Sequence, residues 1–177
     1  MTSLNVGDKA PNFVALNEFG QSISLSEFLG KKIVLYFYPK DMTPGCTAES
    51  CNLSENYSLL QEKGFIVLGV SPDSSKSHQK FIDKYNLPFS LIADEDKAVI
   101  KAFGVWGPKK FMGKEYDGVH RTTFVIDQNG VIEKVFSKVK TKDHTNQILE
   151  SYDMWHKLSQ ITCWFVTEIN LETMEKE

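Results

Sequence analysis

The sequence predicts an α/β fold in which a mixed β-sheet is flanked by helices. Two apolar runs, Ile33–Tyr38 and Phe65–Val70, are typical of strands buried on both faces, and the helical pattern between them is long enough for a parallel crossover. Later, Thr122–Asp127 and Val131–Phe136 flank an Asn-Gly turn, a strong hairpin signal because both residues tolerate positive φ. The alternative is a doubly wound, all-parallel sheet, and the Asn-Gly hairpin counts against it.

The first half of the chain alternates strand and helix patterns. Pro11–Leu25 alternates loosely around residues 17–20 and predicts an N-terminal β-hairpin extension. Pro39 ends the first buried strand, and a loop continues from there to Gly45. One helix then extends to Gly64, and its apolar stripe consists of Cys46, Leu53, Tyr57 and Leu60.

The second half repeats the pattern more weakly. We expect a helix near Ser77–Tyr85, a strand near Phe89–Ala93 and a short helix near Lys97–Phe103. Gly107–Gly118 is rich in glycine and lysine and predicts a loop before the closing hairpin, and a last helix begins near Asp143. A βαβ unit followed by a ββα unit is the thioredoxin-like arrangement.

Length and composition predict one soluble globular domain, or one domain with an appendage. The 177 residues contain 20 Lys and Arg against 23 Asp and Glu, a net charge of −3, which argues against a nucleic-acid or anionic-membrane partner. No apolar run approaches the roughly eighteen residues that cross a bilayer, and the N-terminus shows no secretory signal. We therefore expect a cytoplasmic protein, in which three cysteines are not a disulfide scaffold.

Cys46 is the most informative residue. Thr43 fits the N-cap position and Pro44 the first helical position, so Cys46 falls in the first turn. Unpaired backbone N–H groups and the helix dipole favour an anion at this place, and the thiolate is the nucleophilic form of cysteine. The turn also follows the carboxyl end of a central strand, where α/β sheets place their ligand sites. These features predict a reactive cysteine rather than a structural one.

Cys51 lies five residues further along the predicted helix. Five helical steps place the two Cα atoms about 8–9 Å apart, whereas a disulfide requires less than about 7 Å. The two thiols therefore either never join or join after the first helical turns unwind. Glu49 and Ser50, which are polar or small, keep the free energy of such an opening low.

Arg121 is placed beside Cys46 by topology. The strand that follows Arg121 runs antiparallel to the central strand in the predicted sheet, so its first residue lies at the edge where Tyr38 ends. A guanidinium at this edge would stabilise a thiolate and offer several donors to a small, oxygen-rich substrate.

These residues resemble a known family. The segment Pro39–Cys46 reads Pro-x-x-x-Thr-x-x-Cys and is similar to the signature of the peroxiredoxins. The longer Tyr36–Cys51 segment resembles the subgroup called bacterioferritin comigratory protein or peroxiredoxin Q. Gly7–Phe13, Val105–Lys114 and His120–Asp127 are similar to other parts of that subgroup, so the likeness extends over about residues 3–150. It implies the same thioredoxin-like fold that the order of elements predicts.

The resemblance implies roles around the cysteine. Thr43 matches the residue whose hydroxyl bonds to peroxide and thiolate, and Arg121 matches the arginine that activates the sulfur and orients the substrate. Pro39 matches the proline that shields the pocket, and Glu49 matches the acid that helps to hold the arginine.

The resemblance also implies a thiol-dependent peroxidase cycle. Cys46 matches the peroxidatic cysteine, which attacks hydrogen peroxide or an organic hydroperoxide and becomes a sulfenic acid. Cys51 matches the resolving cysteine, present in part of the subgroup, which condenses with it to a disulfide. Thioredoxin or a similar dithiol then restores both thiols. No metal, flavin or nicotinamide is expected, and the expected state is a monomer or weak homodimer.

Other functions fit the sequence less well. A thiol–disulfide exchange module would need a Cys-x-x-Cys, but four residues separate Cys46 from Cys51. A structural zinc site usually needs two close ligand pairs, and no second pair occurs among the four histidines, which are His78, His120, His144 and His156. A chaperone activity is left open.

The segment Ser151–Glu177 departs from the subgroup, which usually ends near Glu150. The resemblance therefore implies a domain over residues 1–150 and a C-terminal extension over residues 151–177. We interpret it as the end of a helix plus an apolar segment packed on the domain, or as an interaction surface, because exposed aromatic clusters mark interfaces. Cys163 in this segment is a small buried hydrophobe or a competing resolving thiol. The basic stretch Lys109–Lys114 is interpreted as solvated surface.

Overall fold

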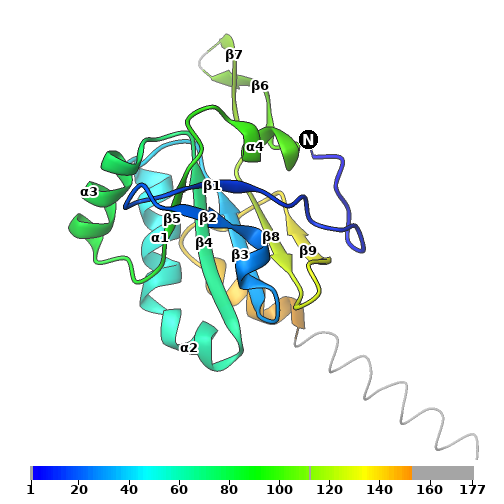
Figure 1. Cartoon of the computed structure of the whole chain (residues 1–177). Helices are drawn as coiled ribbons and strands as arrows, with labels where there is room; N and C mark the ends of the chain where they lie inside the picture. Colours follow the sequence, from blue (N-terminus) through cyan, green and yellow to red (C-terminus); the bar gives the residue numbers. More distant parts are fainter. Residues whose placement is uncertain (1, 112, 153–177) are drawn as a thin grey trace, which may run out of the picture.

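The computed structural model describes residues 2–111 and 113–152, which form a seven-stranded sheet with helices on both faces (Figure 1). The strand order is β2-β1-β5-β4-β3-β8-β9. β3 (Lys32–Phe37) is parallel to β4 (Phe65–Ser71), which is parallel to β5 (Leu91–Ala93). β8 (Thr122–Ile126) is antiparallel to both β3 and β9 (Ile132–Phe136). The predicted mixed sheet is therefore confirmed.

β3 is central because both of its faces are covered. Ile33, Leu35 and Phe37 point into one apolar cluster, whereas Val34 and Tyr36 point into the other. The face of Tyr36 is covered by four helical segments, which are α1 (Pro44–Glu55), α2 (Tyr57–Glu62), α3 (Ser75–Tyr85) and residues 144–152. The opposite face is covered by the 3-10 helix η1 (Leu25–Phe28) and α4 (Ala98–Ala102).

The predicted N-terminal hairpin is present as β1 (Val14–Asn17) and β2 (Ser22–Ser24). It is more than an extension, because β1 also pairs antiparallel with β5 and so continues the main sheet. The nearly buried Glu18 carboxylate supports this junction by accepting a 3.2 Å hydrogen bond from the backbone N–H of Leu91.

Two predictions were wrong. The helix predicted up to Gly64 is interrupted at Asn56, whose side-chain amide donates to the Asn52 carbonyl (2.8 Å) and competes with the regular ladder. The predicted loop Gly107–Gly118 belongs to a hairpin of β6 (Trp106–Phe111) and β7 (Lys114–Val119), which projects from the body (Figure 1). This ribbon lies apart from the main sheet and carries many charged side chains, so its sequence lacks the apolar alternation that reveals a half-buried strand.

The closing hairpin has the predicted Asn-Gly turn. Asp127 Oδ1 accepts hydrogen bonds from the backbone N–H groups of Asn129 (2.8 Å) and Val131 (2.7 Å), and Gly130 has a φ of 79°. The predicted last helix is present over residues 144–152, and the rest of the 151–177 extension, including Cys163, lies outside the described residues. In the described part of the chain, no helix combines the length and apolarity needed to span a bilayer.

Candidate active site

The site lies at the sheet edge where β3 ends. Phe37 pairs with Val70 on one side and with Thr122 on the other, so the residue before Thr122 is brought next to the loop that leaves β3. That residue is Arg121. The loop then enters α1, and the start of α1 and Arg121 face each other as the topology predicts.

α1 begins with the geometry that the sequence predicts. Thr43 is the N-cap with φ −82° and ψ 150°, Pro44 is the first helical residue, and Cys46 is therefore the third. The Thr43 hydroxyl does not cap the helix; it donates to the carbonyl of Lys40 at 3.1 Å. The side chain of Cys46 is fully buried among the residues that cover the Tyr36 face of the sheet.

Arg121 joins Cys46 to Glu49. Its Nη2 donates to the Cys46 sulfur at 3.1 Å, and its Nη1 forms an ion pair with Glu49 Oε2. A Cβ on Gly45 would lie 3.5 Å from Nη2, so the first turn of α1 lies against the guanidinium. A planar guanidinium can contact both partners because its donors point in fixed, separate directions, and a lysine ammonium could not do so equally well.

Burial controls the charges of this cluster. The side chain of Glu49 is fully buried, and burial raises its pKa to about 7 although the charge and hydrogen bonds of Arg121 lower it. Burial alone would lower the pKa of Arg121, but the charges of Glu49 and Cys46 raise it above its ordinary value. Glu49 Oε1 is buried and has no hydrogen-bond partner. The arginine therefore remains a cation, while the carboxyl group titrates near neutrality.

Cys51 lies in the same uninterrupted helix as Cys46, and both are free thiols. It is half-buried, and burial followed by the charge of Glu55 raises the pKa of its thiol. The two cysteines thus differ in setting: Cys46 has a cationic donor, whereas Cys51 has an anionic neighbour and stays protonated.

Pro39 is partly buried where the chain leaves β3, four residues before Thr43. Two of the histidines that the structure describes are engaged with other groups. His78 contacts Asp41 and the carbonyl of Ile92, and His144 contacts Thr123 and Gln147. Within residues 2–111 and 113–152, no three His, Cys, Asp or Glu side chains cluster so as to hold a metal ion.

Two residues near the site were missed by the sequence reasoning. Lys109 was included in solvated surface, yet it is partly buried and its ammonium donates to the Val119 carbonyl at 2.9 Å. Burial and then the charge of Arg121 lower the pKa of Lys109. Asp41 is nearly buried although it occupies a loop. The signal for Asp41 was its place inside the motif, between Pro39 and Thr43.

Comparison with known proteins places the chain in a family. Residues 6–135 match the AhpC/TSA family. A protein of Haemophilus influenzae named putative peroxiredoxin bcp is 49% identical over 150 residues, which cover 85% of this chain and 97% of the relative. Peroxiredoxin Bcp of Bacillus subtilis is 46% identical over 149 residues, which cover 84% of this chain and 95% of the relative.

Solved structures agree with this result. A cysteine-to-serine mutant of PrxQ from Xylella fastidiosa aligns with a TM-score of 0.81 and 31% identity, covering 88% of this chain and 99% of the other. The bacterioferritin comigratory protein of Xanthomonas campestris, studied for its alkyl peroxide reduction activity, aligns with a TM-score of 0.77 and 32% identity, covering 87% and 98%. The thioredoxin-like fold is thereby confirmed.

Proposed function

Because this chain belongs to the peroxiredoxins of the AhpC/TSA family and is a thiol-dependent peroxidase, we propose that Cys46 is the cysteine that reacts with peroxide. One observation carries this assignment: the Cys46 sulfur lies in the first turn of α1 and accepts a hydrogen bond from Arg121 Nη2 at 3.1 Å. A cationic donor at this distance stabilises negative charge on sulfur, and the thiolate is the attacking species.

In the first step, the Cys46 thiolate attacks one oxygen of the hydroperoxide. An S–O bond forms as the O–O bond breaks, so the sulfur is oxidised by two electrons to a sulfenic acid. The leaving RO⁻ takes a proton and departs as an alcohol, or as water when the substrate is hydrogen peroxide. Arg121 orients the peroxide and stabilises the charge that develops on its oxygens, the Thr43 hydroxyl bonds to the peroxide, and Pro39 shields this side of the site. Glu49 holds the guanidinium in place.

In the second step, the Cys51 thiol condenses with the Cys46 sulfenic acid. An S–S bond forms as the S–O bond breaks, and the oxygen that sulfur took from the peroxide leaves as water; the peroxide itself is already reduced by two electrons in the first step. The first turns of α1 must unwind beforehand, because an intact helix holds the two Cα atoms about 8–9 Å apart. An external dithiol of the thioredoxin type then reduces the disulfide by exchange and becomes oxidised itself. The cycle requires no metal, flavin or nicotinamide in this chain.

The substrate class includes organic hydroperoxides as well as hydrogen peroxide. Support comes from the similar Xanthomonas campestris protein, which reduces alkyl peroxide. We place the protein in the cytoplasm, as a monomer or weak homodimer whose catalytic domain comprises residues 1–150 and whose tail comprises residues 151–177. The three cysteines, too few for a disulfide scaffold, support a reducing compartment.

The test measures peroxide consumption with thioredoxin, thioredoxin reductase and NADPH present. Cys46→Ser should abolish turnover, whereas Cys51→Ser should still consume about one equivalent of peroxide before stopping. Mass spectrometry of wild-type protein after one equivalent of peroxide should find a Cys46–Cys51 crosslink. Full turnover by Cys46→Ser would refute the assignment of the peroxide-reactive thiol, and a Cys46–Cys163 crosslink would refute that of Cys51.

A further inference from the structure

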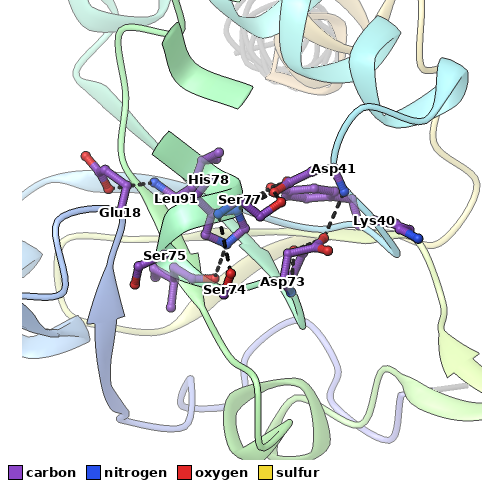
Figure 2. A network of polar contacts seen from close by, with 12 residues as sticks. Glu18, Lys40, Asp41, Asp73, Ser74, Ser75, Ser77, His78 and Leu91 are labelled. Carbon is purple, nitrogen blue, oxygen red and sulfur yellow. Dashed lines mark hydrogen bonds and ion pairs between the residues drawn. The ribbon is translucent and has the colours of Figure 1, made fainter. Parts of the chain in front are cut away.

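A buried polar cluster anchors the loop between β3 and α1 (Figure 2). Asp41, in this loop, has a carboxylate that is 3% exposed and accepts hydrogen bonds from three side chains. Oδ2 accepts from His78 Nδ1 (2.9 Å) and Ser77 Oγ (2.7 Å), and Oδ1 accepts from the Tyr38 hydroxyl (2.7 Å). His78 and Ser77 belong to α3, so the carboxylate ties the loop to a separate helix.

The contact between Asp41 and His78 is an ion pair. His78 Nε2 lies 3.1 Å from the carbonyl of Ile92, which can only accept, so this nitrogen carries a proton. Burial would raise the pKa of Asp41, but the hydrogen bond and charge of His78 hold it below its ordinary value. The carboxylate is thus ionised, and Nδ1 must donate to it. Removing either charge would leave the other buried without its counter-ion, which is strongly unfavourable.

The same anchor holds the backbone that leads into the active site. The N–H of Asp41 donates to Asp73 Oδ2 at 2.8 Å, and Ser71 Oγ donates to the same oxygen at 2.8 Å. The next residue, Met42, has a φ of 56°, a left-handed conformation that a residue with a side chain keeps only when its surroundings impose it. Cys46 follows five residues after Asp41, so the position of the loop determines where α1 begins.

The second half of α1 is held by other contacts. The Tyr36 hydroxyl and Ser50 Oγ are 2.9 Å apart in the buried core. Asn52 Oδ1 accepts the backbone N–H of Thr145 at 2.8 Å, and its Nδ2 donates to the carbonyl of Lys142 at 3.2 Å. These contacts tie Ser50 and Asn52, on either side of Cys51, to β3 and to the start of the last helix. The cluster of Asp41 with His78, Ser77 and Tyr38 therefore restrains the start of α1, which must unwind, while the part of α1 around Cys51 is held on β3 and the last helix by its own contacts.

We propose that Asp41 and His78 are positioning residues for Cys46: their ion pair holds the 39–46 segment closed, with Arg121 at the sulfur, and opposes the opened form in which Cys46 reaches Cys51. This role rests on the proposed Cys46–Cys51 disulfide. Peroxide reacts with the closed form, and the disulfide forms from the opened one. The rate of disulfide formation divided by the rate of reaction with peroxide, called the rate ratio below, therefore rises as the equilibrium shifts toward the opened form.

The test separates the two rates in a single turnover without reductant. Rapid quenching and mass spectrometry yield the rate of sulfenic acid formation at Cys46 and the rate of disulfide formation. In Asp41→Asn and in His78→Gln, the ratio of disulfide rate to peroxide rate should rise about tenfold, because one charge-assisted hydrogen bond is lost from the closed form alone. The double variant should show no larger rise than either single variant, since the two residues act as one unit. In excess peroxide, the fraction of Cys46 overoxidised to sulfinic acid should be lower in these variants than in the wild type, because faster disulfide formation removes the sulfenic acid.

Two further variants separate positioning from general stability. Asp94→Asn is the matched control: Asp94 is 2% exposed, and its carboxylate accepts the N–H groups of Val99 and Ile100 and forms no hydrogen bond with Asp41 or His78. Its backbone N–H, which Asn keeps, donates to the Ser71 carbonyl at 3.0 Å, so this variant should melt earlier with an unchanged rate ratio. Ser77→Ala removes one hydrogen bond to Asp41 without unpairing a charge, and should raise the ratio by less, about threefold, even if the charge variants fail to fold.

The outcomes distinguish the two proposals. A wild-type protein that forms the disulfide, together with unchanged ratios in the Asp41, His78 and Ser77 variants, would overturn the positioning role alone. Equal changes in the Asp94→Asn control would overturn it too, because the effect would then report stability. A wild type that forms sulfenic acid but no Cys46–Cys51 disulfide would overturn the proposed cycle and the positioning role with it.

Discussion

Replacing Arg121 tests whether the bridge between Cys46 and Glu49 acts in chemistry or only in folding. Arg121→Met removes the donor that lies 3.1 Å from the sulfur and keeps most of the apolar side-chain volume. A hydrogen bond to a charged group contributes about 1.5–3 kcal/mol, so the second-order rate with peroxide should fall by about 10- to 150-fold. Arg121→Lys should lose less, because it keeps a cation but cannot contact both partners.

Glu49 affects the stability of the Arg121→Met variant, and replacing Glu49 as well provides the control. Without Arg121, the fully buried carboxyl group has no counter-ion, so its pKa rises above the value of about 7 that it has beside the arginine. A carboxyl pKa raised above its unfolded value of 4.5 stabilises the fold at low pH, and this contribution is lost as the pH rises through the folded pKa. Arg121→Met should therefore lose stability as the pH rises from 4.5 to above 7, and continue to lose it where the wild type no longer does, whereas Arg121→Met with Glu49→Gln should not.

The assays are stopped-flow consumption of peroxide in a single turnover and urea unfolding across the pH range. The double variant should regain stability and keep the slow reaction. If it regained the reaction rate together with the stability, Arg121 would act only by neutralising Glu49, and the role given to it in activating the sulfur would be wrong.

Three further variants test other contacts. His144→Gln should remove a contribution to stability that is lost in acid, because burial lowers the pKa of His144 from 6.5 to about 4. As the pH falls from 6.5 to 4, the free energy of unfolding of the wild type should therefore decrease by about 3 kcal/mol more than that of the variant, measured by urea unfolding at each pH. An equal pH slope in both proteins would contradict this. Thr43→Val should slow the reaction with peroxide by about fivefold and leave the melting temperature nearly unchanged, since the hydroxyl is partly exposed and donates to the Lys40 carbonyl; a normal rate would exclude Thr43 from peroxide binding. Gly69→Ala should lower the free energy of unfolding by about 1–3 kcal/mol, because the new Cβ would lie 2.6 Å from Leu91 Cδ2 and 2.7 Å from Tyr36 Cζ; unchanged stability would show that this part of the core can give way.

The sequence predicts best the parts of the fold that are buried on both sides. β3 and β4 contain long continuous apolar runs, so their central place in the sheet follows from burial alone. The start of α1 follows from local backbone chemistry, because Thr43 and Pro44 suit the first positions of a helix. Arg121 could be placed near Cys46 because the antiparallel direction of β8 fixes the position of its backbone, independently of its side-chain contacts.

The parts that could not be predicted depend on specific tertiary contacts. The sequence offers His78 only as a possible zinc ligand, but α3 turns it inward, where Asp41 and the Ile92 carbonyl satisfy both ring nitrogens. Neither residue has an apolar pattern that would reveal its burial. β6 and β7 were missed for a related reason, since a ribbon outside the main sheet needs no buried face.

The composition of α1 suits the proposed cycle, in which one helix first holds the reactive sulfur and then releases it. The buried side chains of α1 are Cys46, Glu49, Ser50 and Leu53, and Leu53 is the one large apolar member. Unwinding the first turns therefore exposes a thiol and a charged group that water solvates well, whereas the apolar contact of Leu53 lies beyond Cys51 and stays in place. A helix start built on large apolar residues would resist opening through the burial of their surface, at about 25 cal/mol per Å². Here the resistance comes instead from a few polar contacts, among them the almost fully buried Asp41–His78 pair, so single substitutions are expected to shift the balance between the proposed closed and opened forms.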